Sequence, residues 1–400
     1  MATDALNAAC PAHGDRDDRK SAAIAAANVR PKDGARVVGS YAGARAVLRS
    51  ALMKQAGAQA EDIKFDNPEH VSFFFLDGDL HRKRRAAVAS YFTPKTIIAR
   101  YHSVMQRTMD ALIAELRAAG SAPLDVMSFQ MAVDVAADIV GLVESDRKGL
   151  ARRVRAVLNA SFVPPARTRI GRSLQMARTA WAAWDFHQKD VAPAVKARRA
   201  QPRDDVISYM VKEGYSRQSM IIECLTYGSA GMMTTREFIV MAAWHLFGND
   251  ALRERYLAGP EPEQFAILEE IVRLEPVAAM LHRRADADTE DAATGQVREG
   301  QLLAIDIRQA NTDEAITGPC PHALDPDRAR RMKVMGSYMS FGDGAHRCPG
   351  SQVALHETRI FLDRLLRVPG VRLAQEPTVQ WLEALGSYEL RGAIVACDRA

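Results

Sequence analysis

One ten-residue segment, FGDGAHRCPG at residues 341–350, constrains this chain more than any other feature. Its glycines permit positive φ angles and close approach of the backbone around a single cysteine, Cys348. A helical pattern begins directly after the segment, and Arg347 precedes the cysteine, so both the helix N-terminus and the neighbouring charge favour a thiolate. The alternative is a glycine-rich turn that holds a buried thiol. None of the five cysteines forms a CxxC or CxxCH motif, which disfavours a zinc ribbon and a covalently attached c-type haem.

The composition is that of a folded globular protein. The 400 residues are 48% hydrophobic and 26% charged, which excludes wholesale disorder. The net charge is +4, and the basic residues are interleaved with 49 acidic ones, so we expect no nucleic-acid partner. No uncharged apolar stretch reaches about 18 residues, and the N-terminus lacks the apolar core of a secretory signal. We therefore expect a loose leader at 1–35, one domain at 36–400, no membrane segment and a cytoplasmic location.

Hydrophobic periodicity predicts a mostly α fold with small β-sheets. Residues 36–52 contain a short strand, VVGSY, followed by a helix, and residues 95–260 are largely helical apart from a break at 164–165. Another helix is expected at 263–275, followed by β-like pieces such as VREGQLLAIDI. A last long helix, SQVALHETRIFLDRLL, comes directly after the cysteine segment. Strands and helices do not alternate as they do in a doubly wound sheet.

The cysteine segment resembles the haem-binding loop of the cytochromes P450, which has the form FxxGxxxCxG, often with His two residues before the Cys. The matching positions are Phe341, Gly344, His346, Cys348 and Gly350. This family holds haem iron by a cysteine thiolate. The resemblance therefore implies the cytochrome P450 fold, Cys348 as the axial iron ligand and haem b as the cofactor.

Glu270 and Arg273 are three residues apart on the helix before Pro276, so their side chains can pair. As an ordinary surface pair they would contribute only a few tenths of a kcal/mol. In the resemblance they match the family's ExxR, a buried structural pair to which the family adds a later arginine. Arg328, in LDPDR, is the candidate for that arginine, although Leu324 stands where the family usually has Phe.

His81 and Arg85 lie one helical turn apart in DGDLHRKRRAAV. They match the family's HxxxR, whose side chains bind the haem propionates, and carboxylates in an apolar pocket need such fixed donors. Arg283 matches the arginine that pairs with the second propionate, with its neighbour Arg284 as the alternative register. His346 is the remaining propionate candidate.

Three basic residues between His81 and Arg85, namely Arg82, Lys83 and Arg84, are expected on a solvated helix face. Together with Arg347, they suit an acidic iron–sulfur partner through electrostatic steering. We expect electrons to come from separate proteins, a ferredoxin and a ferredoxin reductase.

The segment LTYGSAGMMTTREFIV carries no charge before its arginine, which predicts a buried central helix. Gly228 and Gly231 cost helix stability, and close helix packing is one explanation for them. In the resemblance, Ala230, Gly231, Thr234 and Thr235 match the oxygen-binding groove AGx(D/E)TT. Thr234 would then hydrogen-bond dioxygen or its accompanying water.

Met233 replaces the acid that the groove pattern usually contains. A thioether cannot ionise and is only a weak acceptor, so the family's proton-relay route is in doubt. Glu237, about one turn after Thr234, can take over part of that role, as can a water chain. Alternatively, Glu237 pairs with Arg236 and does not face the haem pocket.

The resemblance implies an enzyme, a monomeric haem-thiolate monooxygenase. It would insert one atom of dioxygen into a C–H bond of a small apolar substrate, using two electrons and two protons. One alternative is a peroxide-driven peroxygenase of the same fold, suggested by Met233. Another is a haem-thiolate protein that binds a ligand or senses a gas without turnover. A cysteine hydrolase is a remote idea, because no orienting third group accompanies His346 and Cys348.

The substrate itself is beyond the sequence. Family geometry suggests an apolar pocket lined from four parts of the chain, namely Phe73–Phe75, a loop region at 158–180, Ala230 and Val277–Met280. These positions do not distinguish a terpenoid from a steroid, an aromatic compound or a fatty acid.

Overall fold

The computed structural model describes residues 19, 31–57, 60–61, 70–161, 166–382 and 386–399. Most of the expected leader at 1–35, and the expected break at Pro164 and Pro165, lie outside the described residues. The chain divides into two compact units, and each is described by itself. The sheet unit comprises residues 1–61, 241–348 and 377–391, and the helical unit comprises residues 62–240, 349–376 and 392–400.

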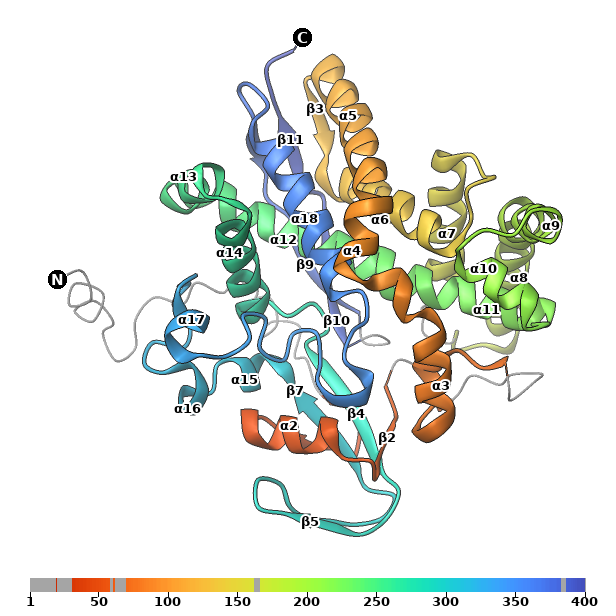
Figure 1. Ribbon diagram of the computed structural model, residues 1–400, viewed down its shortest axis with the longest axis vertical. Helices are drawn as coiled ribbons and strands as arrows, with labels where there is room; N and C mark the ends of the chain where they lie inside the picture. The colour runs from red at the N-terminus through yellow and green to blue at the C-terminus, as the bar shows by residue number, and fades with distance from the viewer. Residues whose placement is uncertain are drawn as a thin grey trace. The chain divides into compact units, whose positions relative to one another are not determined.

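A four-stranded sheet with the strand order β1–β7–β4–β2 organises the sheet unit (Figure 1). β1 runs parallel to β7, whereas β7 with β4 and β4 with β2 are antiparallel pairs. Ile305 on β7 lies opposite both Val38 on β1 and Leu281 on β4, which fixes the register across the sheet. The strands are β1 (Arg36–Val38), β2 (Met53–Gln55), β4 (Met280–Ala285) and β7 (Leu302–Asp306).

Helix α2 (Tyr41–Arg49) packs on this sheet with its apolar side. Ser40 caps the helix, because its side-chain oxygen accepts a hydrogen bond from the backbone of the first turn. Val47 and Leu48 are buried in one core cluster with Ile305 of the sheet. The short strand and the helix predicted for this part of the chain are thereby confirmed.

The rest of the sheet unit consists of short helices, two hairpins and irregular segments. Its longest complete helix, α14, begins with a proline in its first turn and ends before Pro276, where a helix cannot readily continue. The further elements are α13 (Asp250–Ala258), α14 (Glu261–Leu274), β5 (Thr289–Asp291), β6 (Gly295–Val297), α15 (Ile307–Asn311), α16 (Glu314–Thr317), α17 (Arg328–Met332), β9 (Thr378–Leu382) and β10 (Ser387–Arg391).

The helical unit surrounds helix α6, which is apolar and buried around most of its circumference. α6 packs against α5, α7, α18 and the π-helical segment Gly228–Met233. Gly120 and Gly141 end α5 and α6 in the left-handed conformation, which glycine adopts without a steric penalty. The helices are α3 (Gly78–Val88), α4 (Pro94–Thr96), α5 (His102–Ala119), α6 (Leu124–Val140), α7 (Arg147–Ser161), α8 (Arg169–Phe186), α9 (Ala192–Ala200), α10 (Val206–Lys212), α11 (Arg217–Tyr227) and α18 (Ser351–Leu366).

Two connections complete this description. A three-stranded sheet of the helical unit has the order β3–β11–β8, with β3 (Ser121–Pro123), β11 (Ile394–Ala396) and β8 (Arg372–Gln375). Helix α12 (Thr234–Phe247) continues the π-helical segment and passes from the helical unit into the sheet unit. No helix within the described parts of the chain is both long enough and apolar enough to cross a membrane.

The fold class predicted from the sequence, mostly α with small sheets, is confirmed. The last long helix is α18, which begins directly after the cysteine segment as predicted. A loop throughout 158–180 is wrong, because α7 extends to Ser161 and α8 begins at Arg169, while residues 166–168 are not helical. Apolar residues continue the helical period up to 161 and again from 169.

A buried carboxyl on α18 gives the protein a pH-dependent stability. Burial, and then the negative charge of Asp134, raise the pKa of Glu357 to about 8. Since the pKa of an unfolded glutamate is roughly 4.3, the folded state binds more protons between these two values. The contribution of Glu357 to stability is therefore fully present at low pH and is lost as the pH rises through about 8.

We predict that Glu357→Gln, which removes this titration, loses less stability than the wild type between roughly pH 5 and pH 9. The urea midpoint of unfolding, measured across that range, checks this. Glu376→Gln, at an exposed site of the same unit, is the control and should follow the wild type. Identical pH profiles for wild type and Glu357→Gln would contradict the prediction.

Candidate functional site

The loop that contains Cys348 is held by its own backbone. The amide of Cys348 donates to the carbonyl of Phe341 at 2.8 Å, and the amide of Arg347 donates to the carbonyl of Gly344 at 3.2 Å. The amide of Gly342 donates to Met339 at 2.8 Å, which closes the turn that enters the loop. Cys348 is not disulfide-bonded and is partly exposed. The loop therefore presents one sulfur atom from a fixed backbone.

Gly344 is required by a close backbone contact. Its φ is +66°, and a Cβ atom at this position would lie 2.2 Å from the carbonyl oxygen of Leu48 on α2. Gly342 also has a positive φ, +70°, but the nearest atom to its Cβ position lies at 3.9 Å. The two glycines thus differ in kind: Gly342 serves the turn, whereas Gly344 lets the cysteine loop rest directly on α2.

An ion pair joins the same loop to α2. Arg49 donates to the two carboxylate oxygens of Asp343 at 2.8 and 3.1 Å. Partial burial acts to raise the pKa of Asp343, but the hydrogen bonds from Arg49 and from the Gly344 amide outweigh it and hold that pKa below its usual value. The carboxylate is therefore charged at neutral pH and fixes the loop in place.

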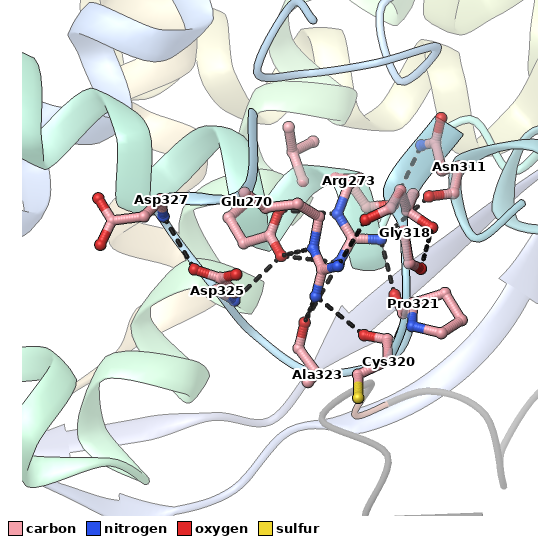
Figure 2. Close-up of polar contacts among 12 residues, drawn as sticks. Glu270, Arg273, Asn311, Gly318, Cys320, Pro321, Ala323, Asp325 and Asp327 are labelled. Atoms are coloured by element: carbon pink, nitrogen blue, oxygen red, sulfur yellow. Dashed lines mark hydrogen bonds and ion pairs between the residues drawn. The ribbon is translucent and has the colours of Figure 1, made fainter. Parts of the chain in front are cut away.

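A buried polar cluster is centred on Glu270 and Arg273 of α14 (Figure 2). Arg273 Nε and Nη2 each donate to a Glu270 oxygen at 2.7 Å, and the Arg273 side chain is 0% exposed. Arg328 also donates to Glu270, at 3.2 Å, and is buried. The remaining donors of Arg328 reach backbone carbonyls, among them Thr317 at 2.9 Å and Ala323 at 3.0 Å. This is a buried pair and not the exposed surface pair that the sequence left open.

Asn311 connects this cluster to the cysteine loop. Its side-chain amide donates to the carbonyl of Arg273 at 3.0 Å and to Ser340 Oγ at 2.8 Å. Its side-chain oxygen accepts from the amide of Met339 at 2.9 Å, and Ser340 Oγ donates to the carbonyl of Val272 at 2.7 Å. Sequence reasoning did not assign Asn311 a role, because only the fold brings it to the end of α14.

The sheet unit also separates the two arginines that the sequence could not tell apart. Arg283 is buried on β4, where Nη1 donates to the carbonyl of His282 at 2.8 Å and to the side chain of Gln55. Arg284, the next residue on β4, points to the opposite face of the sheet. It pairs with Glu61 at 2.6 and 3.0 Å near the surface. His346 lies in the 3-10 turn just before Cys348 and is partly buried.

In the helical unit, α3 carries the His81 and Arg85 pair. His81 is 1% exposed, and Phe73 lies against it with ring centroids 6.2 Å apart. Arg85 is partly buried, and its guanidinium lies 6.0 Å from the centre of the Phe73 ring. Both side chains therefore leave α3 on the side that faces the Phe73–Phe75 turn.

The expectation of a solvated face is wrong for Arg84. Arg84 is 8% exposed, donates to the Tyr209 hydroxyl at 2.8 Å and stacks over the Tyr215 ring at 5.3 Å. It is three residues after His81, so the helical period places it on the buried side of α3. Arg82 and Lys83 are exposed as expected.

The predicted oxygen-binding groove overlaps the end of the π-helical segment Gly228–Met233 and the first two residues of α12, Thr234 and Thr235. Such segments widen one turn of a helix and occur frequently at functional sites. The hydroxyl of Thr234 donates to the carbonyl of Ala230 at 2.6 Å. No atom of a described residue lies within 4 Å of a Cβ placed at Gly231, and Ala230 is exposed, so close packing against the described helices does not explain Gly231. Among the described residues, this turn has open space beside it.

Glu237 is buried and paired within its own helix. Arg236 Nε donates to Glu237 at 2.7 Å, and the Arg236 guanidinium lies 5.4 Å from the centre of the Phe129 ring on α6. This is the arrangement expected if Glu237 is a structural residue and not a proton donor. Met233 is also buried, so the position of the family's acid carries an apolar side chain.

The expected substrate-lining residues that the structure describes differ in exposure. Phe73–Phe75 form a 3-10 turn and are partly exposed, and Ala230 is exposed. In the sheet unit, Val277 and Ala279 are buried and Met280 is partly exposed. The open positions Ala230 and Gly231 are those with room for a ligand beside them.

The donor set fits a cofactor that brings most of its own metal ligands. Within the described ranges, no group of three or more His, Cys, Asp or Glu side chains can hold a metal ion. A partly exposed cysteine in a rigid loop supplies one ligand, and a haem supplies four from its porphyrin nitrogens. The residues therefore fit a haem with Cys348 as the protein ligand.

Comparisons with known proteins agree with this class. A family model described as "Cytochrome P450" matches residues 265–378. The steroid C26-monooxygenase of Mycolicibacterium smegmatis is 27% identical over 345 residues, covering 84% of this chain and 81% of that protein. The mycinamicin IV hydroxylase/epoxidase of Micromonospora griseorubida is 26% identical over 376 residues, covering 89% and 88%.

Solved structures share the fold at lower sequence identity. The crystal structure of CalO2 matches with a TM-score of 0.76 and 22% identity over 92% of each chain. P450BioI in complex with a hexadecenoic acid-ligated acyl carrier protein matches with a TM-score of 0.73, over 90% of this chain and 92% of that one. Fold, site and relatives together define a haem-thiolate monooxygenase. The family model, the curated relatives and the solved structures together support a bacterial cytochrome P450, a family whose members use a haem, dioxygen, an organic substrate and redox partners.

The two loop glycines give a matched pair of variants. Both Gly342→Ala and Gly344→Ala place a Cβ at positive φ, which costs roughly 1–2 kcal/mol. Only Gly344→Ala also drives a Cβ into the carbonyl of Leu48. We predict that Gly342→Ala retains haem, whereas Gly344→Ala purifies with much less. Haem content per chain checks this, and equal retention in both variants would contradict it.

Proposed function

We propose that this cytochrome P450 binds haem b through Cys348 and hydroxylates a small apolar substrate. Electrons would come from a ferredoxin and its reductase, and residues 36–400 would act as one monomeric catalytic domain. The observation that carries the proposal is the cysteine loop: backbone hydrogen bonds hold it and it presents the thiol of Cys348, which is not disulfide-bonded. The buried Glu270 and Arg273 pair, which Asn311 links to the loop, supports the same assignment.

Haem propionates that are removed from water need hydrogen-bond donors from cationic or neutral side chains. His81 and Arg85 from α3, and Arg283 and His346 from the sheet unit, would supply those donors. Arg283 is preferred to Arg284 because Arg284 is already paired with Glu61 near the surface. Charge-assisted hydrogen bonds of this kind are roughly twice as strong as neutral ones.

When bound, the haem supplies the activation of dioxygen and the transfer of one oxygen atom to a C–H bond. The other oxygen atom leaves as water, with two electrons and two protons. Thr234 Oγ1 donates to the carbonyl of Ala230, so its lone pairs can accept a hydrogen bond from water beside the open turn. We assign proton handling to Thr234 and water, and a structural role to Glu237 because it pairs with Arg236.

The names of the relatives support an apolar organic substrate. Their printed names include a steroid C26-monooxygenase and a mycinamicin IV hydroxylase/epoxidase. The apolar residues Phe73–Phe75, Ala230 and Val277–Met280 are the proposed lining of the substrate pocket.

The exposed cations Arg82 and Lys83 on α3 are the proposed contacts for an acidic ferredoxin, with Arg347 as a further one. Arg84 is left out because it is buried against Tyr209.

A second candidate function is a peroxide-driven peroxygenase of the same fold. The observation that favours it is Met233, which is buried where the family's groove pattern has an acid. Peroxide brings both the oxygen atom and the electrons, so the reaction would not depend on proton delivery or on redox partners.

Arg283 and Arg284 form a matched test of the propionate assignment. We predict that Arg283→Leu loses haem faster than Arg284→Leu, since a hydrogen bond to a charged group contributes about 1.5–3 kcal/mol, or roughly 10- to 100-fold. Transfer of haem to an acceptor protein measures the rate. Equal rates for the two variants would show that neither arginine holds a propionate.

Turnover separates the two candidate functions. We predict that the wild type forms product with NADH, a surrogate ferredoxin and reductase, and forms less product with peroxide alone. We also predict that Glu237→Gln keeps the wild-type amount of product formed per NADH consumed. Met233→Asp should raise that ratio, because an acid at this position can deliver protons. Higher turnover with peroxide than with the redox proteins, reduced by Met233→Asp, would favour the peroxygenase. A loss of coupling in a stably folded Glu237→Gln protein would restore Glu237 as a proton donor.

A further inference from the structure

A second pocket lies within the helical unit, outside all residues assigned above. It opens where the π-helical segment His187–Val191 and helix α9 pass the beginning of α11, and its volume is about 300 Å³. That volume is at the lower end of the range for small-molecule sites. Its floor is apolar and buried, with Val191, Tyr215 and Met220 among the lining residues.

Three exposed cations line the same pocket: Lys196, Arg199 and Arg217. None of them forms an ion pair or a side-chain hydrogen bond with any residue that the structure describes. Neighbouring arginines behave differently. Arg153 donates to Asp190 at 2.6 Å, and Arg198 donates to Glu144 at 2.6 Å. The three cations at this pocket therefore form no ion pair with a described carboxylate, whereas Asp190 and Glu144 are paired with Arg153 and Arg198.

The position of Arg217 at a helix N-terminus adds to the positive electrostatic potential at the pocket. Arg217 is the first residue of α11, directly after the capping residue Ser216, and the first turn of this helix contains no acidic residue. A helix N-terminus carries a partial positive charge and disfavours a cation. An ordinary solvated surface gives no reason to place an arginine there. A negatively charged ligand removes the penalty.

His187 adds a polar atom to this otherwise apolar floor. Its Nδ1 is buried and has no hydrogen-bond partner among the described residues. Burial, and then the charge of Arg217, lower the pKa of His187, so the ring is neutral at neutral pH. A neutral imidazole nitrogen can donate to, or accept from, an oxygen atom of a ligand.

We propose that this pocket binds a small amphiphilic anion, a carboxylate or phosphate attached to an apolar body. The apolar part would cover Val191 and Met220, and the anionic head would pair with Arg217, Lys196 and Arg199. The argument uses only the helical unit and does not depend on the haem assignment.

The test is isothermal titration calorimetry of the holoenzyme with 4-phenylbutyrate, with 4-phenylbutanol and inorganic phosphate as partial ligands. We expect 4-phenylbutyrate to bind most tightly, because only it has both the anionic head and the apolar body. The double variant Lys196→Gln with Arg217→Gln should bind it at least roughly tenfold more weakly, because charge-assisted hydrogen bonds to the anionic head are lost. Val195→Trp, which fills the pocket, should also weaken binding.

Two controls separate this site from general charge and from the haem pocket. Arg152→Gln removes an exposed arginine elsewhere in the same unit and should leave the affinity unchanged. Binding should persist when imidazole occupies the haem iron. Equal affinity for 4-phenylbutanol or for phosphate alone, an unchanged affinity in the double variant, or competition by imidazole would each overturn the proposal.

Discussion

The guanidinium of Arg273 is the group on which the rest of the sheet unit depends. It is fully removed from solvent, so its donors must all find partners within the protein. Two of them bind Glu270, and the others reach the carbonyls of Asn311, Pro321 and Ala323 at 3.0, 2.8 and 3.3 Å. Removing one partner of a buried pair leaves an uncompensated charge and costs roughly 3–5 kcal/mol. The irregular segment after α16 therefore has little freedom to take another path.

Hydrogen bonds of Asn311 connect the Arg273 cluster to the loop that contains Cys348. Asn311 binds the carbonyl of Arg273 and the amide of Met339, and the turn at Met339 leads into the loop that ends at Cys348. On its other side, the loop rests on α2 through Gly344 and Asp343. The thiol is thus positioned from two sides by groups that themselves have no redox chemistry. This is the support that a single axial ligand needs if the cofactor supplies the remaining ligands.

The sequence predicted what is encoded locally. The loop around Cys348, the spacing of Glu270 and Arg273, and helix α18 each depend on a contiguous pattern, and the structure has these elements where the patterns indicate. Arg84 was misjudged because its partner, Tyr209, lies 125 residues further along the chain. Asn311 was missed because its role depends on the end of a different helix. The cations of the second pocket come from two helices, so no local pattern in the sequence could join them.

The central claim is that Cys348 is the one thiolate that binds haem iron. The most direct measurement is the absorption spectrum of the reduced, carbon monoxide-bound protein, recorded for wild type, Cys348→His and Cys397→Ser. Cys397 is a buried free cysteine in the helical unit and serves as the matched control. The account predicts the red-shifted band of thiolate-bound haem in the wild type and in Cys397→Ser, and its loss in Cys348→His. A Cys348→His protein that kept this band would contradict the assignment.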